Sequence, residues 1–185
     1  MVDQDSTLPS PARLWKEMSD TQKIDAADAF WRDPEGAAQQ VEAVALLSQR
    51  LKARPRYIQG LPVEKRARHL AHYHGMPEIL AARLLVSYHL AHRRAMMGAF
   101  LDALGIPHDN GLITTDPEGP IPADRLGGAV KTLRASYPAD DVRLYFATLL
   151  AQDPETWKAL EPEIAGNAEN AENAGQANSR RSQEG

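Results

Sequence analysis

The chain has no cysteine among its 185 residues, which excludes disulfide bonds, thiolate nucleophiles, iron–sulfur clusters and zinc fingers. Any metal site would have to use histidine and carboxylate ligands. The sequence also contains no phosphate-loop motif, no Gly-x-Gly-x-x-Gly and no Gly-x-Ser-x-Gly. These absences remove the most direct routes to naming an enzyme, and we predict no cofactor.

No hydrophobic run is both long and uncharged enough for a membrane span. The most apolar stretch, residues 79–104, contains Arg83, Arg93, Arg94 and Asp102. The N-terminus is polar and lacks the basic and apolar regions of a secretory signal. We therefore expect a soluble, cytoplasmic protein that does not bind membranes. Arginine outnumbers lysine by 15 to 6, which favours a bacterial source.

Helical periodicity, punctuated by proline, predicts an all-α fold. Apolar residues recur at intervals of three and four in residues 20–32, 34–53, 63–73, 123–135 and 139–152, and a last short helix follows at 155–160. Residues 78–104 contain no proline and are apolar at nearly every angular position, which predicts one long central helix that ends at Gly105. The predicted architecture is a compact bundle of six or seven helices around this helix.

Composition divides the chain into three parts. We expect an extended or disordered arm over residues 1–18, a single helical domain over 19–164, and a disordered tail over 165–185. The tail contains no Leu, Ile, Val or aromatic residue and repeats Asn-Ala-Glu, so it has little apolar surface to bury. Within the domain, residues 106–122 are rich in turn residues and predict a long loop with a short extended piece at 112–114.

The histidines suggest one candidate site. His-Leu-Ala-His occurs twice, and the spacing of three places His69 with His72, and His89 with His92, on one face of a helix. Two antiparallel helices could bring these four side chains to one metal ion. In the alternative interpretation His89 and His92 belong to the core or its boundary, and His69 and His72 lie on a solvated basic face. The nearby arginines would repel a cation, and no Glu-x-x-His occurs.

Clustered positive charge suggests a second candidate site. Residues 50–94 carry ten Lys or Arg and two acidic residues, between flanks that are both acidic. The candidate contacts for an anion or a partner are Arg50, Arg54, Arg56, Lys65, Arg66, Arg68, Arg93 and Arg94. In the alternative interpretation these cations face the acidic flanks of the same chain or only solvate a helical surface. Nucleic acid is disfavoured because the net charge is −4 and the helix after Gly75 begins with aliphatic residues that cannot read bases.

The first hypothesis for function is a non-enzymatic protein-interaction or regulatory module, with another protein or a second copy as partner. It predicts an exposed apolar groove beside the basic face. The alternative is a metal- or small-anion-binding protein, or an enzyme, that uses the His-rich and basic region 65–94. That alternative predicts an enclosed pocket in which Tyr88, His89 and His92 meet His69 or His72. The third hypothesis is non-specific nucleic-acid binding through residues 50–94.

Overall fold

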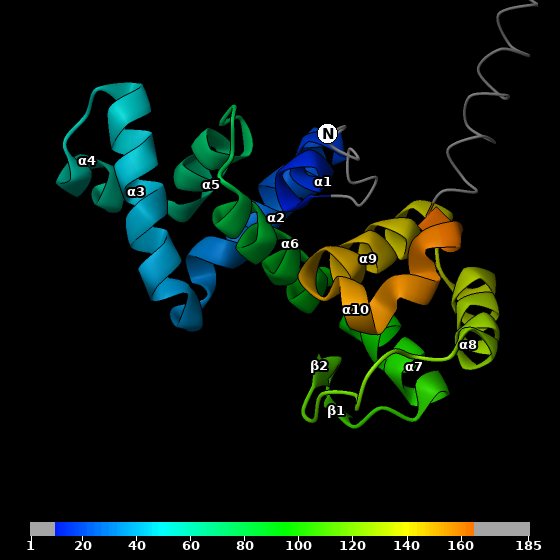
Figure 1. Cartoon of the computed structure of the whole chain (residues 1–185). Coiled ribbons are helices and arrows are strands. Elements are labelled where there is room, and N and C mark those ends of the chain that lie inside the picture. Colours follow the sequence, from blue (N-terminus) through cyan, green and yellow to red (C-terminus); the bar gives the residue numbers. More distant parts are fainter. Residues whose placement is uncertain (1–9, 165–185) are drawn as a thin grey trace, which may run out of the picture.

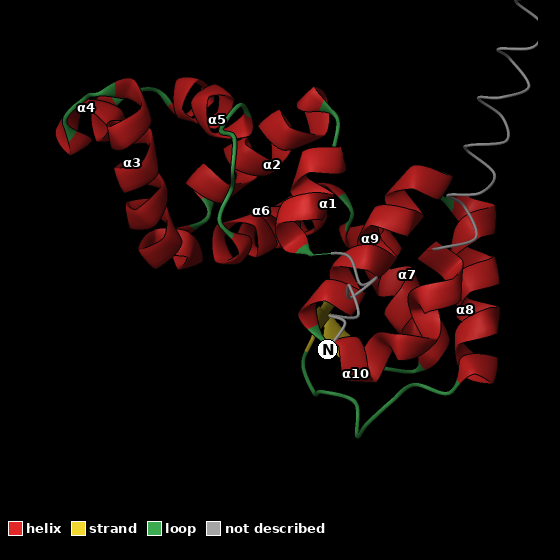
Figure 2. Cartoon of the chain, turned by 45° about the horizontal axis from the view of Figure 1, so that its top comes forward, coloured by secondary structure: helices red, strands yellow, loops and turns green. Residues whose placement is uncertain are grey.

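A computed structural model of the chain describes residues 10–164, which are mostly helical (Figure 2). Within this range the chain forms ten α-helices, two short 3-10 helices and one two-stranded hairpin, so the predicted all-α class is confirmed. The predicted tail over 165–185 and the first nine residues of the predicted arm lie outside the described residues. The rest of the arm is not extended, because helix α1 spans Pro11–Glu17 and buries Leu14 and Trp15.

The two N-terminal helices form in response to local capping signals. Ser10 caps α1 and Pro11 occupies its first turn, where the missing N–H costs nothing. Helix α2 (Asp20–Arg32) begins with a capping box. The Ser19 hydroxyl accepts a hydrogen bond from the Gln22 N–H at 3.2 Å, and the Gln22 side chain accepts one from the Ser19 N–H at 3.0 Å. Helix α2 then packs its apolar face against α5 and α6.

Helices α3, α4 and α5 lie together at one end of the molecule (Figure 1). A 3-10 turn at Pro34–Gly36 leads into α3 (Ala37–Leu51), which is followed by α4 (Pro55–Gly60) and α5 (Val63–Ala71). Helix α3 ends at Lys52 in the left-handed conformation, with φ of 50°. The Arg50 guanidinium donates hydrogen bonds to the carbonyls of His69 and His72, so it fixes the end of α3 to the end of α5.

The predicted continuous helix over 78–104 is wrong, because the chain breaks at Arg93 into α6 (Glu78–His92) and α7 (Arg94–Leu104). Arg93 leaves the helical conformation with φ of −133° and ψ of 19°. Its N–H still closes the last turn of α6 by donating to the His89 carbonyl at 2.8 Å, while its side chain reaches Asp141 on α9. The break is therefore accompanied by a tertiary ion pair that a straight helix would not be expected to form.

The break separates two hydrophobic clusters. The first lies among α1 to α6 and includes Phe30, Leu47 and Leu84. The second lies among α7 to α10 and includes Phe100 and Phe146. Helix α9 joins them, because its Ala147 packs in the first cluster while most of its buried side chains belong to the second. The bundle therefore has two cores in place of the expected single hub.

The loop after α7 contains a small hairpin, in agreement with the predicted extended piece. Strands β1 (His108–Asp109) and β2 (Leu112–Ile113) pair in antiparallel register. They are joined by Asn110 and Gly111, both with positive φ, as a two-residue turn of this kind requires. Three helices follow, α8 (Ala123–Ser136), α9 (Ala139–Gln152) and α10 (Pro154–Trp157), and a 3-10 turn at Lys158–Leu160.

Within residues 10–164 no helix has both the length and the apolarity needed to cross a bilayer. The cytoplasmic location and the bacterial source stay predictions.

Candidate functional site

His89 is buried at the contact between α6 and α9, with 2% of its surface exposed. Its ring lies edge-on to Tyr145 of α9 and to its neighbour Tyr88, with ring centroids 5.5 Å apart in both pairs. The Nε2 atom lies 3.1 Å from the hydroxyl of Thr148. His89 is therefore held by α9, which lies more than 50 residues further along the chain.

The hydrogen bonds around Thr148 fix the tautomer of His89. The Thr148 hydroxyl donates its hydrogen to the Leu144 carbonyl at 2.8 Å, so it can only accept from His89 Nε2. The Nδ1 atom is then an acceptor, and it has no donor among the described residues. Burial, with a smaller contribution from the Arg93 charge, lowers the pKa of His89 to about 3. The imidazole is thus neutral at physiological pH.

Arg93 links the two halves of the molecule through a polar cluster next to His89. Its guanidinium donates to the Tyr88 hydroxyl at 2.9 Å and to Asp141 of α9 at 3.0 Å. The same guanidinium lies over the Tyr88 ring, 5.2 Å from the centroid. Burial raises the pKa of Tyr88, so its hydroxyl stays protonated. The Arg93 side chain therefore binds Tyr88 and Asp141 inside the fold, in place of the predicted contact with an external anion.

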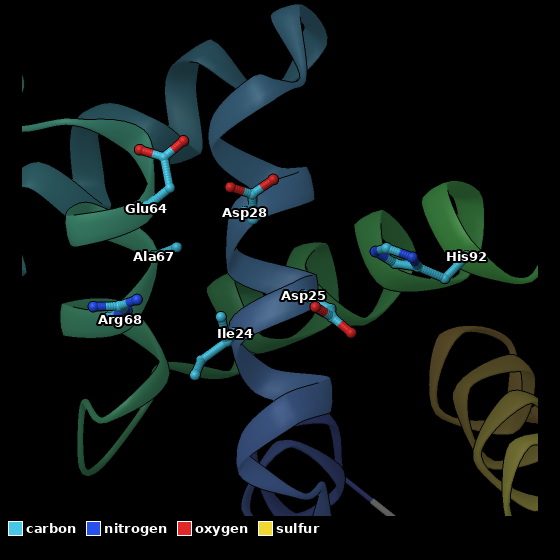
Figure 3. A pocket seen from close by; sticks show the side chains of 7 residues that line it. All are labelled: Ile24, Asp25, Asp28, Glu64, Ala67, Arg68 and His92. Atoms are coloured by element: carbon cyan, nitrogen blue, oxygen red, sulfur yellow. The ribbon is translucent and has the colours of Figure 1, made fainter.

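His92 is exposed and lies apart from His89, although both belong to the last turn of α6. It borders a pocket of about 240 Å³ between α2, α5 and α6 (Figure 3). The lining residues are Ile24, Asp25, Asp28, Glu64, Ala67, Arg68 and His92. Two of the three carboxylates share one counter-ion, because Arg32 pairs with Asp28 at 2.7 Å and with Glu64 at 3.0 Å. The pocket is open, and its lining carries both negative charge, on the carboxylates, and positive charge, on Arg68.

The four histidines proposed as metal ligands do not converge. His72 is exposed at the C-cap of α5, where its Nδ1 lies 2.8 Å from the Arg68 carbonyl, and His69 is half-buried in the last turn of that helix. Over residues 10–164 no group of three or more histidine, aspartate or glutamate side chains is placed to hold a metal ion. The enclosed pocket expected by the enzyme hypothesis, with Tyr88, His89 and His92 facing His69 or His72, is likewise not formed by these residues.

His108 in the long loop has a structural role. Its Nδ1 accepts the Gly111 N–H at 3.2 Å, which places the ring hydrogen on Nε2, and this atom donates to Asp102 at 3.1 Å. Both ring nitrogens are therefore engaged in holding the hairpin against α7. Because neither nitrogen is free, the geometry gives His108 no role as a base.

The eight cations predicted to contact an anion fall into two groups. Four of them are used inside the fold: Arg50 caps α5, Arg66 lies over the Trp31 ring at 4.7 Å, Arg93 pairs with Asp141, and Arg94 donates to the Leu90 carbonyl at 2.6 Å. The other four make no ion pair or side-chain hydrogen bond within residues 10–164: Arg54, Arg56, Lys65 and Arg68.

Together with the equally exposed Lys52, these four side chains are the free cations of α3, α4 and α5 and the turn between α3 and α4, and we call this set the basic end. It comprises Lys52, Arg54, Arg56, Lys65 and Arg68. Lys52 and Arg54 lie in the turn between α3 and α4, and Arg56 lies in the first turn of α4. Lys65 and Arg68 lie on α5, where Arg68 also lines the pocket next to α2. Glu64, the one acidic residue between positions 50 and 72, is paired with Arg32. In the described part of the chain none of these five cations forms an ion pair, and Arg68 shares the pocket lining with Asp25, Asp28 and Glu64.

The large exposed hydrophobic side chains of residues 10–164 do not form the predicted groove. They are Val41, Tyr57, Ile79 and Leu112, and each belongs to a different element. Tyr57 lies on α4 beside Arg56, and 61% of its surface is exposed. The candidate surface is thus defined by charge, with one aromatic side chain inside it.

Comparison of the chain with models of protein families, with curated proteins and with solved structures gives no match.

Two features of these sites were missed at the level of sequence. The pair between Arg93 and Asp141, and the bond between His89 and Thr148, join residues 48 and 59 positions apart. The sequence signals were the charged Asp141 in the first turn of α9 and a lone threonine among apolar residues. Both signals become interpretable only when α9 is known to pack against α6.

Proposed function

We propose that this chain is a non-enzymatic interaction module whose basic end binds an acidic segment of a protein partner. The single observation that carries the proposal is the set of five exposed cations at the end of α3, α4 and α5 that have no counter-ion within residues 10–164. Unpaired charge of one sign on one surface attracts a partner of the opposite sign and speeds their encounter.

A protein partner is favoured over nucleic acid by the rest of the surface. The net charge of the chain is −4, so a polyanionic duplex would be repelled by most of the molecule. A short acidic segment can contact the basic end alone. Tyr57, between Arg56 and Ile58, adds an exposed aromatic ring, and tyrosine and arginine are the residues enriched at the centres of protein interfaces.

Fluorescence anisotropy with a labelled, glutamate-rich helical peptide tests this proposal. We expect binding at about 20 mM NaCl that weakens about tenfold at about 300 mM NaCl, because exposed charges are screened over a Debye length of about 8 Å or less. The double variant R54E/R56E should abolish it. The matched control is K131E/K158E, which changes the net charge by the same amount on the exposed surfaces of α8 and the 3-10 turn after α10.

A DNA duplex of similar charge provides the competing arm. Tighter binding of the duplex than of the peptide, with loss in R54E/R56E, would replace the protein partner by nucleic acid. Absence of binding to the peptide at low salt, or equal weakening by the control variant, would show that the proposal is wrong.

A further inference from the structure

The chain carries an acidic surface that complements its own basic end. Residues 95–124 contain five acidic residues and no Lys or Arg. These side chains, which we call the acidic edge, are Asp102, Asp109, Asp116, Glu118 and Asp124. All five are exposed. Asp102 accepts a hydrogen bond from His108, and the other four form no ion pair within residues 10–164.

The acidic edge cannot neutralise the basic end of the same molecule. The edge follows α7, the hairpin and the loop that leads to α8, whereas the basic end lies on α3, α4 and α5. The β1–β2 hairpin and α4 are far apart in both views of the molecule (Figures 1 and 2). The two charged surfaces are consequently available to different molecules at the same time.

Each of the two surfaces also presents one exposed apolar side chain. Tyr57 is 61% exposed in the basic end, and Leu112 is 44% exposed at the hairpin of the acidic edge. Isolated surface ion pairs contribute little to affinity, so an apolar contact among several pairs matters for measurable association. The two surfaces therefore match in charge and in the one apolar contact that each can offer.

We propose that the acidic segment bound by the basic end is the acidic edge of a second copy of this chain. The contact is heterologous, since a different surface is used on each molecule, and it joins copies head to tail into chains or closed rings. This inference rests on the proposed function, because it assigns the partner of the basic end. It adds that the basic end of one copy contacts the acidic edge of the next copy.

Sedimentation equilibrium of the full chain over a range of concentrations tests the inference. At about 20 mM NaCl we expect a weight-average mass that rises with concentration above the 20.4 kDa of the monomer, and a return to 20.4 kDa at about 500 mM NaCl. A constant monomer mass at low salt up to about 1 mM protein, a concentration at which an association of about 4 kcal/mol would be visible, overturns it.

Charge reversal on each surface identifies the interface. R54E/R56E and D116K/E118K should each remain monomeric alone, because in each variant one of the two complementary surfaces loses almost all of its net charge. An equimolar mixture should associate at low salt, since the unchanged basic end of D116K/E118K meets the unchanged acidic edge of R54E/R56E. K131E/K158E should associate as the unchanged chain does. A monomeric mixture, or association that survives reversal of the acidic edge, contradicts the head-to-tail contact.

The failure of this inference is distinguishable from failure of the proposed function. If the chain is monomeric but binds the glutamate-rich peptide and loses it in R54E/R56E, then the basic end binds an acidic partner other than a second copy. All six substituted positions are exposed and free of ion pairs in the described residues, so far-ultraviolet circular dichroism should be unchanged in every variant. If R54E/R56E loses structure, R54Q/R56Q gives the same comparison with a smaller charge change.

Discussion

The buried, neutral His89 makes the stability of the fold depend on pH in a calculable way. In the unfolded chain the imidazole has a pKa of 6.5, and in the folded state burial lowers it to about 3. Above pH 6.5 the side chain is neutral in both states and contributes no dependence. Between pH 6.5 and about 3 the unfolded state binds a proton that the folded state does not, so the free energy of unfolding decreases as the pH falls.

The size of the effect follows from the same pKa values. Each pH unit in this window removes about 1.4 kcal/mol, so the contribution of His89 between pH 6.5 and 5.0 is about 2 kcal/mol. Substitution of methionine, H89M, removes the titrating group and fills a similar volume against the rings of Tyr88 and Tyr145. At pH 7 it loses one hydrogen bond and relieves the unpaired Nδ1, so its stability should lie within about 1 kcal/mol of the unchanged chain.

Urea denaturation followed by circular dichroism at pH 7, 6 and 5 measures this difference. We expect the unfolding free energy of H89M to fall about 2 kcal/mol less than that of the unchanged chain across the range. The control is H92M, which removes an exposed histidine from the same turn and should leave the pH dependence unaltered. If H89M and the unchanged chain lose stability in parallel, burial does not lower the pKa of His89 in the folded state.

Three further predictions concern stability. G127A and G128A should each stabilise the chain by about 0.5–1 kcal/mol in thermal unfolding, because both glycines lie within α8 and an added Cβ meets nothing within 4 Å; a loss of stability would place unseen contacts on this face. G111A should cost about 2–4 kcal/mol, since its φ is 88° and the new Cβ would lie 2.7 Å from Met97 Cβ; a neutral effect would mean that the hairpin is packed differently. D141N should cost about 2 kcal/mol by leaving Arg93 without its anion, less than a fully buried pair would because the two side chains are 29% and 13% exposed. D140N, one residue earlier on α9, controls for the helix dipole, and equal effects of the two variants would argue against the ion pair.

Local signals predicted most of the helices, because their ends are encoded within a few residues. Ser19 with Gln22 marks the start of α2, and Gly105 before Pro107 marks the end of α7. Helix α1 was missed although Ser10 and Pro11 carried the same kind of signal, since the segment is short and polar. A capping residue followed by proline indicates the start of a helix, even when only two apolar residues follow.

The break at Arg93 and the fate of the histidines could not be predicted, because both depend on α9. Residues 78–104 are helical by every local criterion, and the interruption depends on an anion at Asp141 that local periodicity cannot place. The repeated His-Leu-Ala-His motif gives each pair one helical face, yet His89 is buried against Thr148 while His92 faces solvent. The prediction that His89 lies in the core is confirmed. The prediction that His72 is exposed to solvent is also confirmed. The division of the cations into structural and free groups likewise required the fold.

The central claim, that the basic end is the binding surface, is tested most directly by a titration of ¹⁵N-labelled protein with the glutamate-rich peptide, followed by amide chemical shifts. We predict that the largest and salt-sensitive shifts lie in residues 52–57 and 63–69, with little change in α8 to α10. Shifts concentrated around the pocket between α2, α5 and α6, or on α8 to α10, would contradict the assignment of the basic end.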